Sequence, residues 1–117
     1  MTSETTEYGN YSLITIKASK LDASNGPELK SEFVMLNSHG VKNFVVDMSE
    51  CTYCDSSGLR ALLVANRICD DAIGTLILFG LQPDVENIFR LSMLHTMLLI
   101  VNTKEEAEAL LLKKESM

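Results

Sequence analysis

The sequence predicts an α/β fold with a mixed, mostly parallel sheet of four to five strands and about four helices. Short apolar runs at residues 11–18, 43–48, 75–79 and 97–101 alternate with segments in which apolar residues recur at helical spacing. Such alternation implies right-handed crossovers and therefore parallel neighbouring strands. A length of 117 residues is also typical of one unit with its own core, so we expect residues 1–117 to form a single domain.

The first part of the chain is expected to form one or two edge strands and a helix. Residues 1–10 are polar and predict a weak edge strand or a frayed tail, whereas residues 11–18 have the alternation of a strand. We expect the first one or two strands to be antiparallel at the edge of the sheet. A loop over residues 21–26 then leads to a helix over residues 27–39, because Pro27 suits the first position of a helix.

The rest of the chain continues the alternation. Residues 43–48 contain an uninterrupted apolar triplet, which predicts a strand covered on both faces. A loop over residues 49–55 leads to a helix with a leucine stripe that includes Leu59 and Leu62. The remaining elements are a strand over residues 75–79, a helix that opens at Pro83, a strand over residues 97–101 and a last helix with a capping box at Thr103 and Glu106.

Composition excludes several classes of function. Ten Lys and Arg against sixteen Asp and Glu give a formal charge of −6, which argues against direct binding of nucleic acid or of an anionic membrane. No apolar run approaches the roughly 18 to 20 residues of a membrane helix. The polar, acidic residues 1–10 do not resemble a signal peptide. With three cysteines, an odd number, we expect reduced thiols and a cytoplasmic protein.

The most informative segment is residues 45–63, where a buried strand runs through a loop into a helix that starts at Asp55-Ser56-Ser57-Gly58. Backbone N–H groups at a helix start lack partners within the helix, so a serine there can cap the helix or carry a phosphate. Gly58 lowers helix propensity, and we expect it to keep a side chain out of the way of an approaching partner. In parallel sheets the functional surface lies beyond the carboxyl ends of the strands, an edge that the loops over residues 21–26 and 49–55 both reach.

This segment, VVDMSECTYCDSSGLRALL, resembles the signature of STAS-domain proteins, in particular the bacterial anti-sigma factor antagonists. LDASNGPEL resembles the family's Leu-Asp-Ala loop followed by a helix that begins with proline. GTLILFGLQPDV, IFRLSML and the closing TKEEA also resemble family segments. The resemblance extends over almost the whole chain and implies a STAS-like fold.

The resemblance also implies a function and a site. Ser56 matches the family's switch serine, Ser57 a secondary phosphorylation site, and Asp22 an aspartate that supports phosphorylation. In the family, the unphosphorylated protein binds an ATP-dependent anti-sigma factor serine kinase, which releases a sigma factor, and a serine phosphatase resets the switch. The chain itself would be no enzyme and need no cofactor or metal. The expected partner-binding residues are Asp22, Asp55, Ser56, Ser57, Gly58 and Arg60.

Two residues depart from the family pattern. Cys54 stands where an aliphatic residue or methionine is usual, and Arg60 stands where a small residue is common. We expect the fold to tolerate both, and Arg60 to influence the choice of partner. We expect the effect of phosphorylation to be local: a phosphate adds roughly −1.5 to −2 charge, which a partner packed on Ser56 would have to desolvate. We therefore expect steric and electrostatic blocking without a large conformational change.

Other interpretations of the same residues stay open at this point. Asp55, Ser56 and Ser57 could be a plain helix cap, and Asp22 a turn residue. Some STAS proteins are accessory subunits of lipid-transport ATPases or scaffolds of stress-signalling complexes, in which the serine need not be phosphorylated.

The cysteines and histidines suggest weaker alternatives. Cys51 and Cys54 form a C-x-x-C pair that would suit a redox protein, although Asp55-Ser56-Ser57-Gly58 holds the helix start where a reactive thiol belongs. A zinc site would need a second ligand pair. A Ser-His-Asp hydrolase would need Ser56 and His95 to converge, and the sequence has no G-x-S-x-G elbow.

Overall fold

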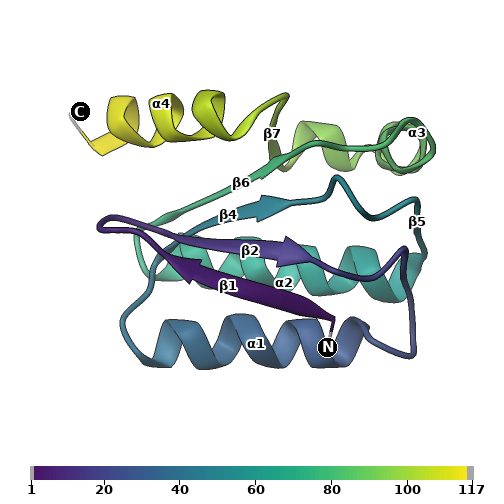
Figure 1. Ribbon diagram of the computed structural model, residues 1–117, viewed down its shortest axis with the longest axis horizontal. Helices are drawn as coiled ribbons and strands as arrows, with labels where there is room; N and C mark the ends of the chain where they lie inside the picture. The colour runs from purple at the N-terminus through teal and green to yellow at the C-terminus, as the bar shows by residue number, and fades with distance from the viewer. Residues whose placement is uncertain (1, 116–117) are drawn as a thin grey trace.

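The computed structural model describes residues 2–115 and has a five-stranded sheet as its centre (Figure 1). The strands lie in the order β1-β2-β4-β6-β7. β1 is antiparallel to β2, and every other neighbouring pair is parallel. Their bounds are Ser3–Glu7 for β1, Ser12–Ile16 for β2, Asn43–Asp47 for β4, Thr75–Phe79 for β6 and Leu99–Val101 for β7.

Helices cover both faces of this sheet. α1 and α2 lie side by side on one face, and α4 lies on the other (Figure 1). The sequence of β4 is continuously apolar because its alternate residues point into cores on opposite faces of the sheet. Phe44 and Val46 belong to the larger core under α1 and α2, while Val45 belongs to a smaller core with Leu111 of α4. The helices are α1 Gly26–Ser38, α2 Ser56–Asp71, α3 Pro83–Leu91 and α4 Lys104–Glu115, with a short 3-10 turn, η1, at Leu94–Thr96.

A second, two-stranded sheet joins the loops that precede α1 and α2. β3 (Lys20–Leu21) and β5 (Tyr53–Cys54) are parallel, with Lys20 opposite Tyr53 and Leu21 opposite Cys54. These residues fall in or beside the loops expected over residues 21–26 and 49–55. Strands of two residues are too short to show an alternating pattern, so this sheet was not predicted.

The predicted fold class is confirmed, with one correction at the edge of the sheet. Of the one or two antiparallel edge strands expected, one is present: β1 is antiparallel to β2, and β2 pairs in parallel with β4. The strand expected over residues 97–101 begins at Leu99, since the Leu98 N–H bonds to the Leu94 carbonyl in the turn that closes η1. Residues 1, 116 and 117 of the expected domain lie outside the described residues. Within residues 2–115, no helix has the length and apolar character needed to cross a membrane.

Candidate functional site

The β3–β5 ladder brings the two predicted loops together at the carboxyl edge of the main sheet. The Leu21 carbonyl accepts a hydrogen bond from the Asp55 N–H at 3.0 Å, and the Ser19 carbonyl accepts one from the Thr52 N–H at 2.7 Å. Asp22 and Asp55 directly follow the paired residues of the two strands. The ladder therefore sets the Asp22 loop beside the start of α2, as the sequence predicted.

Asp55, and neither serine, caps α2. Its Oδ1 accepts hydrogen bonds from the Ser57 N–H at 2.8 Å and from the Gly58 N–H at 3.2 Å. Ser56 is the first helical residue and is exposed. Among residues 2–115, no side-chain hydrogen bond involves its hydroxyl. The cap interpretation thus holds for Asp55, while the Ser56 hydroxyl has no structural partner within the described chain.

Gly58 has a different role from the one expected. It is buried, and a Cβ built on it would lie 2.6 Å from the Leu21 carbonyl oxygen and 2.7 Å from Cys54 Sγ. The first turn of α2 can rest on the β3–β5 ladder only because residue 58 lacks a side chain. Gly58 therefore serves internal packing, and the expectation that it clears space for a partner is wrong.

Asp22 is held by its own loop. Its Oδ1 accepts hydrogen bonds from the Ser24 N–H at 2.9 Å and the Ser24 hydroxyl at 2.6 Å, which lower the pKa of the Asp22 carboxyl below its ordinary value. Asn25 closes the turn through the Asp22 N–H and the Lys20 carbonyl. Asp22 thus has the contacts of a turn residue, and among residues 2–115 it makes no hydrogen bond to Ser56.

Ser57 and Arg60 line a groove of about 200 Å³ between the starts of α1 and α2. The two helices approach closely here, because a Cβ built on Gly26 would lie 3.0 Å from the Ser57 carbonyl oxygen. Lys30 of α1 forms part of the opposite wall. Sequence reasoning did not include Lys30, although its position on the helix after the Asp22 loop was a signal that could have found it.

The family model for the STAS domain matches residues 2–107, which is most of the chain. The chain belongs to the STAS domain family.

Individual relatives of this STAS chain are described as anti-sigma factor antagonists. One is BtrV of Bordetella bronchiseptica, 27% identical over 97 residues that cover 83% of this chain and 84% of BtrV. A solved structure from Thermotoga maritima has a TM-score of 0.83 at 18% identity and covers 93% of both chains. Unphosphorylated SpoIIAA has a TM-score of 0.76 at 20% identity, covering 90% of this chain and 91% of its own. SpoIIAA has also been solved in its phosphorylated form, with a TM-score of 0.70 at 19% identity, covering 92% of this chain and 96% of its own.

The thiols of this STAS domain are not arranged for redox chemistry. Cys51 and Cys54 are buried in the larger core. Burial raises the pKa of Cys54 to about 12, helped by the nearby Cys51 and Asp55, and burial also raises the pKa of Cys51. A reactive cysteine needs the opposite shift. The C-x-x-C pair is therefore core packing in this structure.

The histidines do not join the Ser56 site. His39 is the C-cap residue of α1, and His95 lies in η1 beside a different hollow between α3 and β7. Within residues 2–115, no group of three or more His, Cys, Asp or Glu side chains could hold a metal ion. The geometry gives no support to the hydrolase or zinc alternatives.

Proposed function

We propose that this chain is an anti-sigma factor antagonist controlled by phosphorylation of Ser56. Unphosphorylated, it binds an anti-sigma factor serine kinase and so releases a sigma factor, and phosphorylation abolishes this binding until a serine phosphatase removes the phosphate. Membership of the STAS family and the descriptions of its relatives support this role. One observation carries the site: Ser56 is exposed at the first position of α2 and its hydroxyl makes no hydrogen bond among residues 2–115, while Asp55 already caps that helix.

The negative charge around Ser56 would help a phosphate on this residue to prevent partner binding. The chain has a formal charge of −6, and Asp55 and the ionised Asp22 loop stand at the same edge. Because Asp55 already accepts from the Ser57 and Gly58 N–H groups, these donors are not available to neutralise a phosphate on Ser56. A docked partner would have to desolvate a group of roughly −1.5 to −2 charge. A loss of about 4 kcal/mol would weaken binding about a thousandfold without refolding either protein.

In this proposal the chain acts only by binding, as a cytoplasmic regulator made of a single STAS domain over residues 1–117. ATP and Mg²⁺ belong to the kinase. Ser57 is a secondary acceptor, because its half-buried position in the groove makes it less accessible than Ser56. The binding face consists of the Asp22 loop, Asp55, Ser56, Ser57 and Arg60.

The test is capture of partners from a lysate of the native host, with ADP and Mg²⁺ present and mass spectrometry as the readout. The baits are wild type, Ser56→Ala, Ser56→Asp and a matched control, Ser38→Asp, which adds the same charge at the other end of α1. Wild type, Ser56→Ala and Ser38→Asp should all capture an ATPase-fold anti-sigma kinase, and Ser56→Asp should lose it. Because Ser56 is exposed, Ser56→Ala and Ser56→Asp should keep the free energy of unfolding within about 0.5 kcal/mol of wild type.

Two results would contradict the proposal. If Ser56→Asp captures the kinase as well as wild type does, charge at Ser56 does not control binding. If all four baits recover the same transporter or scaffold subunits and no kinase, the chain is an accessory STAS subunit of a lipid-transport ATPase or a stress-signalling complex.

A further inference from the structure

The groove between the starts of α1 and α2 combines a floor of small residues with two long cationic side chains. It measures about 200 Å³. Lys30 stands on the α1 side and Arg60 on the α2 side, and both are exposed. The hydroxyl of half-buried Ser57 also borders the groove and makes no side-chain hydrogen bond among residues 2–115. The groove is lined by Gly26, Pro27, Lys30, Ser57, Arg60 and Ala61.

Neither cation has an anionic partner within the described part of the chain. Lys17 pairs with Glu4 and Glu50, and Arg90 pairs with Glu86, but no ion pair within residues 2–115 involves Lys30 or Arg60. This is notable in a chain with sixteen acidic residues and ten basic ones. Two basic side chains near each other repel, so their placement lowers stability unless something anionic enters the groove.

Helix geometry adds to this cost. Lys30 is the fifth residue of α1, and Arg60 is the fifth residue of α2. Helical side chains lean toward the N-terminus of their helix, where the helix dipole favours negative charge and disfavours positive charge. Both cations therefore occupy positions that are electrostatically unfavourable in the isolated domain. An anionic group of a bound partner would offset this cost.

We propose that the Lys30–Arg60 groove binds acidic side chains of the protein that docks on the Ser56 face. Arg60 can hold a carboxylate through two parallel hydrogen bonds, while Lys30 and the Ser57 hydroxyl supply further donors. The neighbouring Asp22 and Asp55 repel anions, so this groove fixes where an acidic segment can approach and in which register. The partner's identity rests on the proposed function, whereas the preference of the groove for carboxylates does not.

The groove also gives phosphorylation a second effect. Ser56 and Arg60 are four residues apart on α2 and are therefore neighbours on its surface. Phosphorylated Ser56 would be the acidic member of the pair and would lie nearer the N-terminus of the helix, which is the favourable order for an ion pair. A phosphate on Ser56 would compete with the partner's carboxylate for Arg60. Phosphorylation would then both place a charge in the interface and occupy one of the two cations that attract the partner.

The test uses the full unphosphorylated chain, labelled with ¹⁵N, and a short peptide probe, acetyl-Glu-Glu-Leu-Glu-Glu-amide, at low salt. Amide shifts should concentrate at residues 26–30 and 57–61 and should saturate. In Lys30→Gln/Arg60→Gln, the apparent affinity should fall about fivefold or more, as expected for two exposed charge pairs. The matched control is Lys42→Gln/Arg67→Gln, which removes one exposed lysine and one exposed arginine elsewhere and should bind as wild type does.

The proposal is overturned if the peptide gives no saturable shifts, if the shifts map elsewhere, or if both double variants bind alike. Because the probe involves neither kinase nor phosphate, the two proposals can fail separately. If the peptide fails to bind but Ser56→Asp still releases the kinase, only the groove assignment is wrong. If the peptide binds the groove but Ser56→Asp does not change capture, only the phosphorylation switch is wrong.

Discussion

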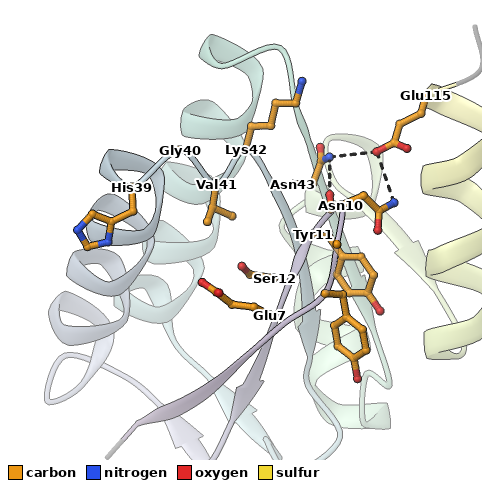
Figure 2. A pocket seen from close by; sticks show the side chains of 12 residues that line it. Glu7, Asn10, Tyr11, Ser12, His39, Gly40, Val41, Lys42, Asn43 and Glu115 are labelled. Carbon is orange, nitrogen blue, oxygen red and sulfur yellow. Dashed lines mark hydrogen bonds between the residues drawn. The ribbon is translucent and has the colours of Figure 1, made fainter.

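The two ends of the parallel strands differ in how their polar groups are used. At the amino ends of β2 and β4 lies a hollow of about 490 Å³, shown in Figure 2. There Asn43 Nδ2 donates to the Asn10 carbonyl at 2.9 Å, and Asn10 Nδ2 donates to Glu115 Oε1 at 3.4 Å. Asn43 Oδ1 accepts from the Thr75 N–H at 2.9 Å. These polar groups hold the β1–β2 turn, β6 and the end of α4 together.

At the carboxyl ends, the groove beside Ser57 and Arg60 is smaller, about 200 Å³, but its polar groups are available. The Ser56 and Ser57 hydroxyls, Lys30 and Arg60 have no side-chain partner within residues 2–115. The two ends therefore differ in whether their polar side chains are bonded within the protein. Donors without internal partners support the binding role proposed for the carboxyl end, and four experiments probe the two ends.

The largest expected effect concerns the cysteines. Burial raises the pKa values of both Cys54, at the carboxyl end, and Cys69 of α2 from 9.0 to about 12, so at pH 8 their thiolate fractions should be about a thousandfold lower than those of free cysteine. Alkylation by iodoacetamide, followed by mass spectrometry, should therefore be slow at both residues until guanidinium unfolds the chain. Faster native modification of Cys51 and Cys54 than of Cys69 would restore the redox interpretation.

Gly58→Ala should be the most destabilising of the single substitutions considered. Helix propensity alone would favour alanine by about 1 kcal/mol. The close contacts of the added Cβ with Leu21 and Cys54 should outweigh this and lower the free energy of unfolding by about 3 kcal/mol. Gly9→Ala at the opposite end is the control, because its Cβ would meet nothing within 4 Å. Urea denaturation measures both, and a stabilised Gly58→Ala would refute the packing argument.

Asn43→Ala tests whether the amino-end hollow is structural. The substitution leaves the partly buried Thr75 N–H and the Asn10 carbonyl without their side-chain partner, so the free energy of unfolding should fall by about 2 kcal/mol. Asn10→Ala loses only the long contact to Glu115 and should cost less than about 0.5 kcal/mol. Partner capture should be unchanged in both variants. Loss of capture in Asn43→Ala, with the fold intact, would mean that this end also has a binding role.

The smallest effect is expected from the cap of α2. Asp55→Ala removes the acceptor for the Ser57 and Gly58 N–H groups and should cost about 1 kcal/mol in thermal or urea unfolding. Asp55→Asn and Asp55→Ser keep an acceptor and should recover most of that loss. Equal stability of Asp55→Ala and wild type would show that the cap contributes nothing, and would reopen a capping role for Ser56.

Much of the main sheet could be predicted because burial on two faces leaves a clear pattern. Phe44, Val45 and Val46 are apolar in sequence because alternate residues enter two different cores. Pro27 indicated a helix start to within one residue, and the Thr103–Glu106 capping box is present, with the Glu106 N–H donating to Thr103 Oγ1 at 3.1 Å. These features depend on neighbours in sequence or on a single repeating period.

The details of the site depend on contacts between distant segments, which a single sequence does not reveal. The β3–β5 ladder joins residues about thirty positions apart. Residue 58 must be glycine because it packs against Leu21. Lys30 lines the groove with Arg60 only because α1 lies beside α2. The sequence also could not show that Asp55 caps α2 and Ser56 does not. Every polar residue at a helix start is a candidate cap until the hydrogen bonds are known.

The antiparallel direction of β1 has a practical consequence for attaching other molecules. It places Ser3, the first residue of β1, at the carboxyl edge, where the neighbouring Thr2 N–H bonds to Glu28 at the start of α1 at 3.2 Å. α4 runs the other way and ends with Glu115 beside Asn10 (Figures 1 and 2). A fluorophore or affinity handle attached at Thr2 would therefore stand beside the proposed docking face, whereas one attached at Glu115 would stand at the opposite end of the strands.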